Sequence, residues 1–277
     1  MRVFICKTCG TEYPPSDAPP PSCPICLDER QYLPVGGQQW TDSETLAQSH
    51  RLVAKEQEPD LIGIGVDPSF AIGQRALLVR TPAGNVLWDC ISLIDDAMRD
   101  RIMAWGGLKA IAISHPHYYS GMISWSSAFG DVPILLHEAD RQWAMRTDGN
   151  VVFWEGDART ILPGVTLIRC GGHFAGGTVL HWTAGAKGTG VLLSGDILQV
   201  AADNRHVSFM RSYPNYMPLS PAVVARIVDR LRPFAFDRIY GAFWDRVIAS
   251  DGKASVARSA QRYIEAVTGH GPADSET

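Results

Sequence analysis

Two histidines one residue apart, His115 and His117, follow an apolar run in the segment AISHPHYYSGM. A third, His173, comes after a pair of glycines in GGHFAGG, and Asp196 closes the segment LLSGD. Neutral imidazoles and a carboxylate that arrive from different loops can converge on one metal ion. His115 and His117 therefore look like a pair of metal ligands, and the residue types of His173 and Asp196 suit the same kind of site.

A second possible metal site lies at the start of the chain, in a proline-rich segment that we define as the ribbon (residues 1–35). Two Cys-x-x-Cys pairs separated by 13 residues are formed there by Cys6, Cys9, Cys23 and Cys26. Four thiolates with this spacing are typical of a tetrahedral structural zinc site, which would stabilise a segment too poor in aliphatic residues to build a core. The alternative is four unrelated thiols or a redox pair.

Composition limits the kinds of partner that this chain can have. Its 277 residues are 45% hydrophobic, enough for one large core, and its net charge is −4. No run of five like charges occurs, so we expect neither nucleic acid nor a membrane surface as a partner. No signal peptide or membrane span is recognisable, so we expect a cytoplasmic protein with a small-molecule substrate. The ribbon could serve as a homodimer contact or as a lid near the metal site.

The pattern of apolar runs predicts an α/β protein. A linker with a short helix, capped by Thr41 or Asp42, is expected over residues 36–59, and the main domain over 60–277. In its first half we expect strands at 61–67, 75–81, 85–91 and 109–114, with a helix over 92–107. In its second half we expect strands at 132–140, 151–157, 164–170, 178–184 and 190–196, a helix over 220–234 and a last strand at 236–242. Two β-rich halves with helices suggest two sheets packed face to face.

Four motifs occur in an order that resembles the metallo-β-lactamase superfamily: HPH, GGHFAGG, LLSGD and, at residues 239–242, IYGA. The resemblance covers about residues 60–250 and implies an αββα sandwich. It also implies that His115, His117 and His173 hold the first metal, and that Asp196 bridges to a second.

Three positions depart from the family pattern. Tyr119 stands where the family has an aspartate, Ser120 where it has a histidine, and Ala242 near its final histidine. Three ligands of the second metal are thus absent, which predicts a mononuclear site that holds zinc or, alternatively, iron. Tyr119 could orient the substrate or stabilise an oxyanion where the second metal would lie.

The resemblance and the ligand set together suggest a hydrolase that uses a metal-bound water on a small organic substrate. Two alternatives remain open: a mono-iron, dioxygenase-like oxidoreductase, in which the ribbon would be a rubredoxin-like electron port, and a ligand-binding protein without catalysis. Aromatic residues near the motifs favour an organic substrate. They are Tyr118, Tyr119, Trp125, Phe174, Phe209, Tyr213, Tyr216, Phe243 and Trp244.

Overall fold

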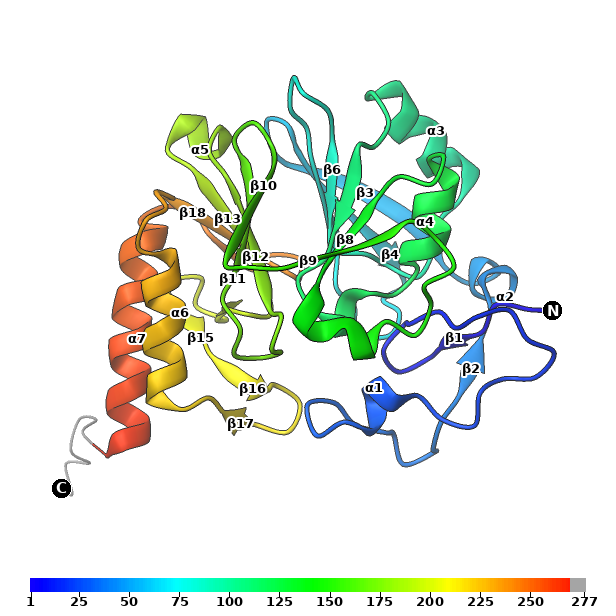
Figure 1. Ribbon diagram of the computed structural model, residues 1–277, viewed down its shortest axis with the longest axis horizontal. Coiled ribbons are helices and arrows are strands. Elements are labelled where there is room, and N and C mark those ends of the chain that lie inside the picture. Colours follow the sequence, from blue (N-terminus) through cyan, green and yellow to red (C-terminus); the bar gives the residue numbers. More distant parts are fainter. Residues whose placement is uncertain (270–277) are drawn as a thin grey trace.

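Two mixed β-sheets pack face to face, and helices cover the outer face of each sheet (Figure 1). This is the αββα arrangement that the sequence predicts. The computed structural model describes residues 1–269, so the last eight residues of the domain expected over 60–277 lie outside the described part. No helix among the described residues is long and apolar enough to cross a membrane.

The first sheet has seven strands in sequential order. Neighbouring strands from β3 to β6 run antiparallel to each other, and neighbouring strands from β6 to β9 run parallel. Parallel neighbours need crossovers, which α3 (Asp96–Ala104) and α4 (Met122–Ala128) supply. The strands are β3 (Arg51–Glu58), β4 (Leu61–Asp67), β5 (Ala76–Val79), β6 (Val86–Trp88), β7 (Ala110–Ala112), β8 (Ile134–His137) and β9 (Val151–Trp154).

The second sheet has six strands in the order β10-β11-β12-β13-β18-β19, of which only the β13–β18 pair is parallel. Its outer face is covered by α6 (Pro221–Leu231) and α7 (Gly252–Thr268), seen at the left of Figure 1. The strands are β10 (Ala158–Leu162), β11 (Val165–Arg169), β12 (Thr178–Trp182), β13 (Val191–Gly195), β18 (Arg238–Gly241) and β19 (Val247–Ile248). Between β12 and α6 lie α5 (Gly185–Gly188), β14 (Gln199–Val200), β15 (Val207–Ser208), β16 (Met210–Ser212) and β17 (Met217–Pro218).

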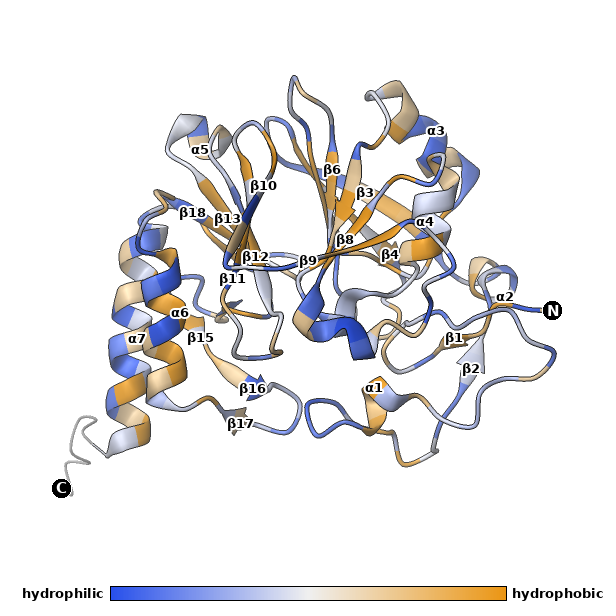
Figure 2. Ribbon diagram, in the orientation of Figure 1, coloured by the Kyte–Doolittle hydropathy of each residue, from blue (hydrophilic) through white to orange (hydrophobic). Residues whose placement is uncertain are grey.

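The core between the sheets is made of large apolar side chains from both of them, including Leu77, Trp88, Leu180 and Leu193. Each sheet also buries its other face under helices, which is why several strands are apolar at every position. Figure 2 shows the result, with hydrophobic strands at the centre and hydrophilic stripes on the outer sides of the helices.

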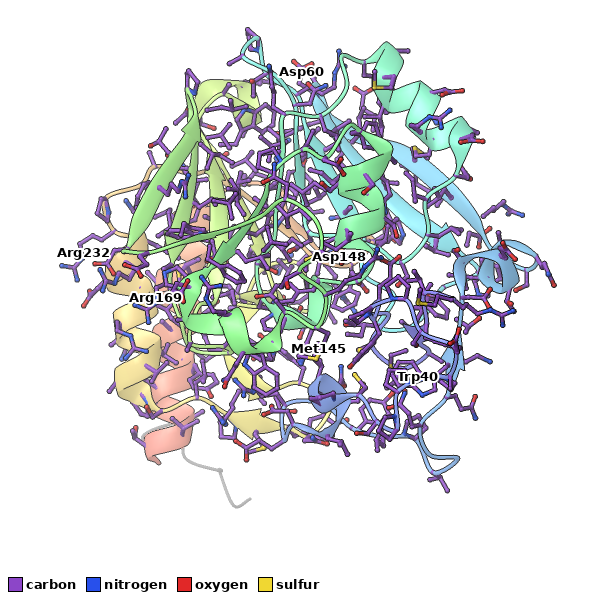
Figure 3. The ribbon with its side chains drawn as sticks, turned by 45° about the vertical axis from the view of Figure 1, so that its right-hand side comes forward. Trp40, Asp60, Met145, Asp148, Arg169 and Arg232 are labelled. Atoms are coloured by element: carbon purple, nitrogen blue, oxygen red, sulfur yellow. The ribbon has the colours of Figure 1, made fainter. Side chains whose placement is uncertain are left out.

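The ribbon lies below the first sheet in Figure 1. It contains β1 (Ile5–Cys6), which pairs with β2 (Trp40–Thr41), and α1 (Pro24–Leu27). Its small core holds the four cysteines with Tyr13 and Ile25, and Trp40 and Met145 pack against it. Met145, labelled in Figure 3 together with Trp40, belongs to the main domain, so the ribbon is packed against that domain.

The structure corrects several expectations about elements. The helix expected within residues 36–59 is only α2 (Ser43–Ala47), capped by Asp42, and the next eight-residue segment, 51–58, is strand β3. Its polar sequence reflects its place at the sheet edge, where one side meets solvent. The strand expected at 236–242 is not the last strand, because β19 follows it. Strand β10 and helix α7 were not predicted.

Candidate metal centre

The proposed ligands come together at one edge of the sandwich because each follows the end of a strand. His115 and His117 follow β7 in a short 3-10 helix, Pro116–Tyr118, and His173 lies in the loop between β11 and β12. Asp196 directly follows Gly195, which has a φ of 51°. A Cβ atom on Gly195 would lie 2.6 Å from Ser114 Oγ, so only glycine lets β13 end this close to the histidine loop.

The three histidine rings are almost equally spaced. Their centroids are 5.1 Å apart for His115 and His117, 4.9 Å for His115 and His173, and 5.0 Å for His117 and His173. One nitrogen from each ring can be chosen so that all three lie within 4.8 Å of one another. His173 Nε2 is 3.2 Å from His117 Nδ1. Two nitrogens bound to one tetrahedral zinc at 2.0–2.1 Å would be about 3.3 Å apart, so the spacing fits an ion.

Hydrogen bonds to the outer nitrogens orient the rings. His173 Nδ1 donates to the carbonyl oxygen of Met210 at 3.1 Å, which leaves the lone pair of Nε2 facing the other rings. His115 Nδ1 lies 2.8 Å from Ser114 Oγ, and its buried Nε2 has no hydrogen-bond partner among the described residues. A buried polar atom without a partner costs free energy, which a bound metal ion would offset.

All three imidazoles are in the form that a metal requires. Burial lowers the pKa values of His115 and His117 well below 6.5, and it lowers the pKa of His173 to about 4. The guanidinium of Arg30 acts in the same direction. The rings are therefore neutral at pH 7, and neutral imidazole is the ligand form.

Asp196 lies near the three histidines, but its carboxylate oxygens are not within 4.8 Å of all three of the chosen histidine nitrogens. Its carboxyl group is buried, which raises its pKa to about 6, and Oδ1 has no hydrogen-bond partner among the described residues. Asp89, also buried, accepts the backbone N–H of Ser114 at 2.8 Å and so positions the start of the histidine loop. The residues present thus fit a metal ion with three imidazole ligands and a carboxylate at the side.

Tyr118, rather than Tyr119, faces the histidines. The ring of Tyr118 lies 4.4 Å from that of His115, and the charge of nearby Asp196 adds to burial in raising the pKa of its hydroxyl group. Both Tyr118 and Tyr119 are buried in the core outside the first sheet, and neither is among the residues that line the cavity at the histidines. Successive residues of a 3-10 helix point about 120° apart, so the two tyrosines face different ways, and the role expected for Tyr119 stays a prediction.

Ser120, at a position where the family pattern has a histidine, is hydrogen-bonded within the protein. The backbone N–H of Glu12 donates to the carbonyl oxygen of Ser120 at 3.2 Å, and Gln74 Nε2 donates to Ser120 Oγ at 2.9 Å. Close by, Ser92 Oγ donates to the carbonyl oxygen of Gly10 at 2.8 Å. The ribbon is thus docked on the loop in which Ser120 replaces a ligand. Within residues 1–269, the only clusters of metal-binding residues are the three histidines and the four cysteines.

The four cysteines of the ribbon are buried, and none forms a disulfide. Cys6 Sγ is 3.6 Å from Cys26 Sγ, and Cys9 Sγ is 3.6 Å from Cys23 Sγ. Sulfur ligands of a tetrahedral zinc at 2.3 Å would be about 3.8 Å apart, so these distances fit a bound ion. Gln38 Nε2 donates to Cys6 Sγ at 3.2 Å, as expected for a thiolate held by hydrogen bonds. The cysteine cluster and the histidine cluster could each bind a metal ion.

A cavity of about 230 Å³ opens onto the histidines, and the ribbon forms one of its walls. Its lining residues are Thr8, Gln31, Tyr32, Ala71, Ile72, His117, His173, Asp196, Gln199, Tyr213, Pro214 and Phe243. Of the aromatic residues expected near the site, Tyr213 and Phe243 line the cavity, whereas Tyr32 was not foreseen. A larger cavity of about 460 Å³, between the β3–β4 turn and α5, contains no histidine or cysteine, so size alone does not locate the centre.

The wall that the ribbon contributes to this cavity is held in place by contacts of residues 29–31, which follow Cys26 in the chain. Asn215 Nδ2 donates to the carbonyl oxygens of Glu29 and Gln31, each at 2.9 Å. The guanidinium of Arg30 lies 4.0 Å from the centre of the Phe174 ring, next to His173 in the chain. These contacts join residues about 140 to 190 positions apart, which no local sequence pattern could have indicated.

The chain is 46% identical, over 269 residues, to the uncharacterized protein YmaE of Bacillus subtilis (strain 168). The match covers 96% of this chain and 97% of that protein. The chain belongs to the YmaE family. No family model matches it.

Solved structures similar to this YmaE-family chain are metallo-β-lactamases. DIM-1, from a crystal exposed to ceftazidime, superposes with a TM-score of 0.58 at 13% identity, over 78% of this chain and 98% of DIM-1. VMB-1 gives 0.57 at 13% identity, with the same coverage of 78% and 98%. A B3 enzyme with an active-site glutamic acid gives 0.53 at 15% identity, over 81% and 95%. At such identities the likeness shows the fold alone, and the metallo-β-lactamase fold predicted from the motifs is confirmed.

Proposed function

We propose that this protein is a mononuclear metal-dependent hydrolase. The observation that carries the proposal is the set of three buried, neutral imidazoles whose free nitrogens converge beside an unpartnered carboxylate oxygen. A zinc ion held there would supply Lewis acidity and a water that ionises at roughly pH 7. A second ion is not needed for this chemistry.

Asp196 and Tyr118 would have separate roles in the reaction beside the ion. Asp196 Oδ1, free of other partners and at the wall of the cavity, would complete the ligand set or accept a proton from the attacking water. The hydroxyl group of Tyr118 is buried, has no hydrogen-bond partner in residues 1–269 and lies near Asp196. It would donate to an oxyanion, the role that the sequence had suggested for Tyr119.

The cavity suits a small, uncharged organic substrate. Among residues 1–269, no lysine or arginine lines it, whereas the side-chain amides of Gln31 and Gln199 and the rings of Tyr32, Tyr213 and Phe243 do. An engineered cavity of about 150 Å³ holds one benzene molecule. The cavity of about 230 Å³ therefore has room for one ring with a scissile ester or amide, for which the glutamines offer hydrogen bonds.

Elemental analysis combined with hydrolysis assays tests the proposal. Wild-type protein, purified without added metal, should carry two ions per chain, and His115→Ala/His117→Ala should carry one. The variant should also lose hydrolysis of a panel of aryl esters and amides. His206→Ala, which changes a partly exposed histidine paired with Asp203, is the matched control and should retain both properties.

Other results would select the alternatives. Iron as the element lost with the histidines, together with oxygen consumption, would favour the mono-iron oxidoreductase, since three histidines and a carboxylate also suit ferrous iron. Full metal content with tight ligand binding and no turnover would favour a binding protein. Unchanged metal content in the double variant would refute the site itself.

A further inference from the structure

A cavity of about 360 Å³ lies on the other side of the loop that carries His173, between this loop and α6. It is lined by Arg169, Cys170, Gly171, Gly172, Ala175, Arg226 and Arg230. Three of these residues are arginines, the other four have small side chains, and none is acidic. The cavity at the histidines differs in composition, because its one charged lining residue is the carboxylate of Asp196.

The arginines reach the cavity from two elements. Arg226 and Arg230 are one turn apart on α6, and Arg169 ends β11, on the side of the molecule that carries α6 and α7 in Figure 3. Arg230 forms an ion pair with the exposed carboxylate of Asp157. Arg169 uses its Nε to donate to the carbonyl oxygen of Ala175 at 3.0 Å, which leaves its terminal nitrogens available. Arg226 forms no ion pair with any residue in 1–269.

Backbone conformation keeps the space beside the guanidinium groups open. Gly171 and Gly172 have φ values of 70° and 87°, a region that favours glycine. A Cβ atom on Gly171 would lie 3.6 Å from Nη2 of Arg226, so the backbone and this guanidinium are already near contact. An occupant could therefore touch both the arginines and the backbone of the loop.

Three positive charges and one carboxylate leave a local charge of +2 on a chain whose net charge is −4. Like charges one helical turn apart repel each other, so this arrangement lowers stability unless an anion neutralises it. A phosphate monoester carries a charge of about −1.5 to −2 at pH 7 and offers three oxygens. Guanidinium groups bind such oxygens in pairs, and donors from separate elements suit a tetrahedral group better than a planar carboxylate.

We propose that this cavity, the arginine pocket, binds the phosphate group of a small phosphorylated molecule. Its volume exceeds that of a single phosphate, so the rest of the molecule would lie along the glycine backbone towards α6. The pocket is separate from the metal centre, and the proposal does not depend on what reaction occurs there.

Calorimetric titration of the full-length protein with inorganic phosphate at low ionic strength tests the proposal. Arg226→Ala should weaken phosphate binding at least tenfold. Arg226→Lys keeps the positive charge but not the planar guanidinium group that donates paired hydrogen bonds, and it should weaken binding less. Arg262→Ala removes an equal charge from an exposed position on α7 and should leave binding unchanged. Equal affinities of wild type, Arg226→Ala and Arg262→Ala, or no binding to wild type at millimolar phosphate, would overturn the proposal.

A metal centre can also bind phosphate, so a second comparison separates the two places. The His115→Ala/His117→Ala variant should retain phosphate binding if the anion sits in the arginine pocket. Loss of binding in that variant, with normal binding by Arg226→Ala, would place phosphate at the histidines and overturn the proposal. Acetate as a competing probe should displace phosphate poorly, and displacement at equal concentration would argue for a carboxylate site instead.

Discussion

Asn215→Ala should loosen the wall that the ribbon contributes to the metal cavity. The Asn215 side chain donates two hydrogen bonds, each 2.9 Å long, to the backbone of Glu29 and Gln31. A hydrogen bond of this kind contributes about 0.5–1.5 kcal/mol net, so the substitution removes about 1–3 kcal/mol from docking of the segment. The undocked fraction of residues 29–32 should rise roughly 5- to 150-fold.

Hydrogen exchange measured by mass spectrometry reads this fraction directly, because amide exchange in a segment that opens locally follows the open population. Peptides that cover residues 29–33 should exchange faster in the variant by the same factor. Peptides from β4 and β13 should not change, since their amides are held by sheet hydrogen bonds. Both metal ions should stay bound, because neither ligand set contacts Asn215.

Asn150→Ala provides the matched control, since it removes an exposed asparagine whose hydrogen bond goes to the carbonyl oxygen of Asp131, far from the ribbon in sequence. Exchange over residues 29–33 should stay at the wild-type rate in this control. The reasoning is refuted if Asn215→Ala leaves exchange there unchanged, or if Asn150→Ala accelerates it equally.

Three further predictions concern single side chains. Cys23→Ser should reduce the metal content by one ion per chain and expose residues 1–35 to trypsin, whereas Cys170→Ser, at a buried cysteine outside the cluster, should keep both ions by elemental analysis. Tyr118→Phe should lower kcat about 10- to 100-fold with unchanged metal content, and an equal loss in Tyr119→Phe would contradict the assignment. Burial raises the pKa of Asp140 to about 6, so the native state takes up a proton below pH 6 while the unfolded carboxyl group stays ionised until about pH 4. The free energy of unfolding should thus gain about 1 kcal/mol from this group between pH 7 and pH 5, and urea unfolding of Asp140→Asn should lack that gain.

The two clusters of possible metal-binding residues were predictable because their members lie in motifs with recognisable spacing or order. His115, His117, His173 and the four cysteines need only this local information, and the structure brings each set together. The orientation of Tyr118 was not predictable in this way, because it depends on whether the chain after His115 continues as a 3-10 helix. Tyr32 was not predicted to line the cavity, because it is far from the motifs in sequence and reaches the cavity only through docking of the ribbon.

Elements were predicted well where the core imposes a clear apolar pattern, as in β4 and β13, and poorly at edges. Strand β3 has polar residues at most positions because it pairs on one side only, and its sequence therefore resembles that of a surface helix. Helix α7 buries small residues such as Ser255 and Ala260, which give a weaker apolar pattern than Val224, Ile227 and Leu231 of α6.

The ribbon wall has a consequence for the order in which the protein is made. During synthesis the ribbon leaves the ribosome before the hairpin that fastens it, around Asn215, which follows almost two hundred residues later. The cavity beside the histidines therefore takes shape only after this hairpin has been made, even though the four cysteines come together within the ribbon. The same arrangement lets the shape of the cavity and the three histidines evolve independently. Substitutions in the ribbon can change which molecule fits the cavity while the histidines stay the same.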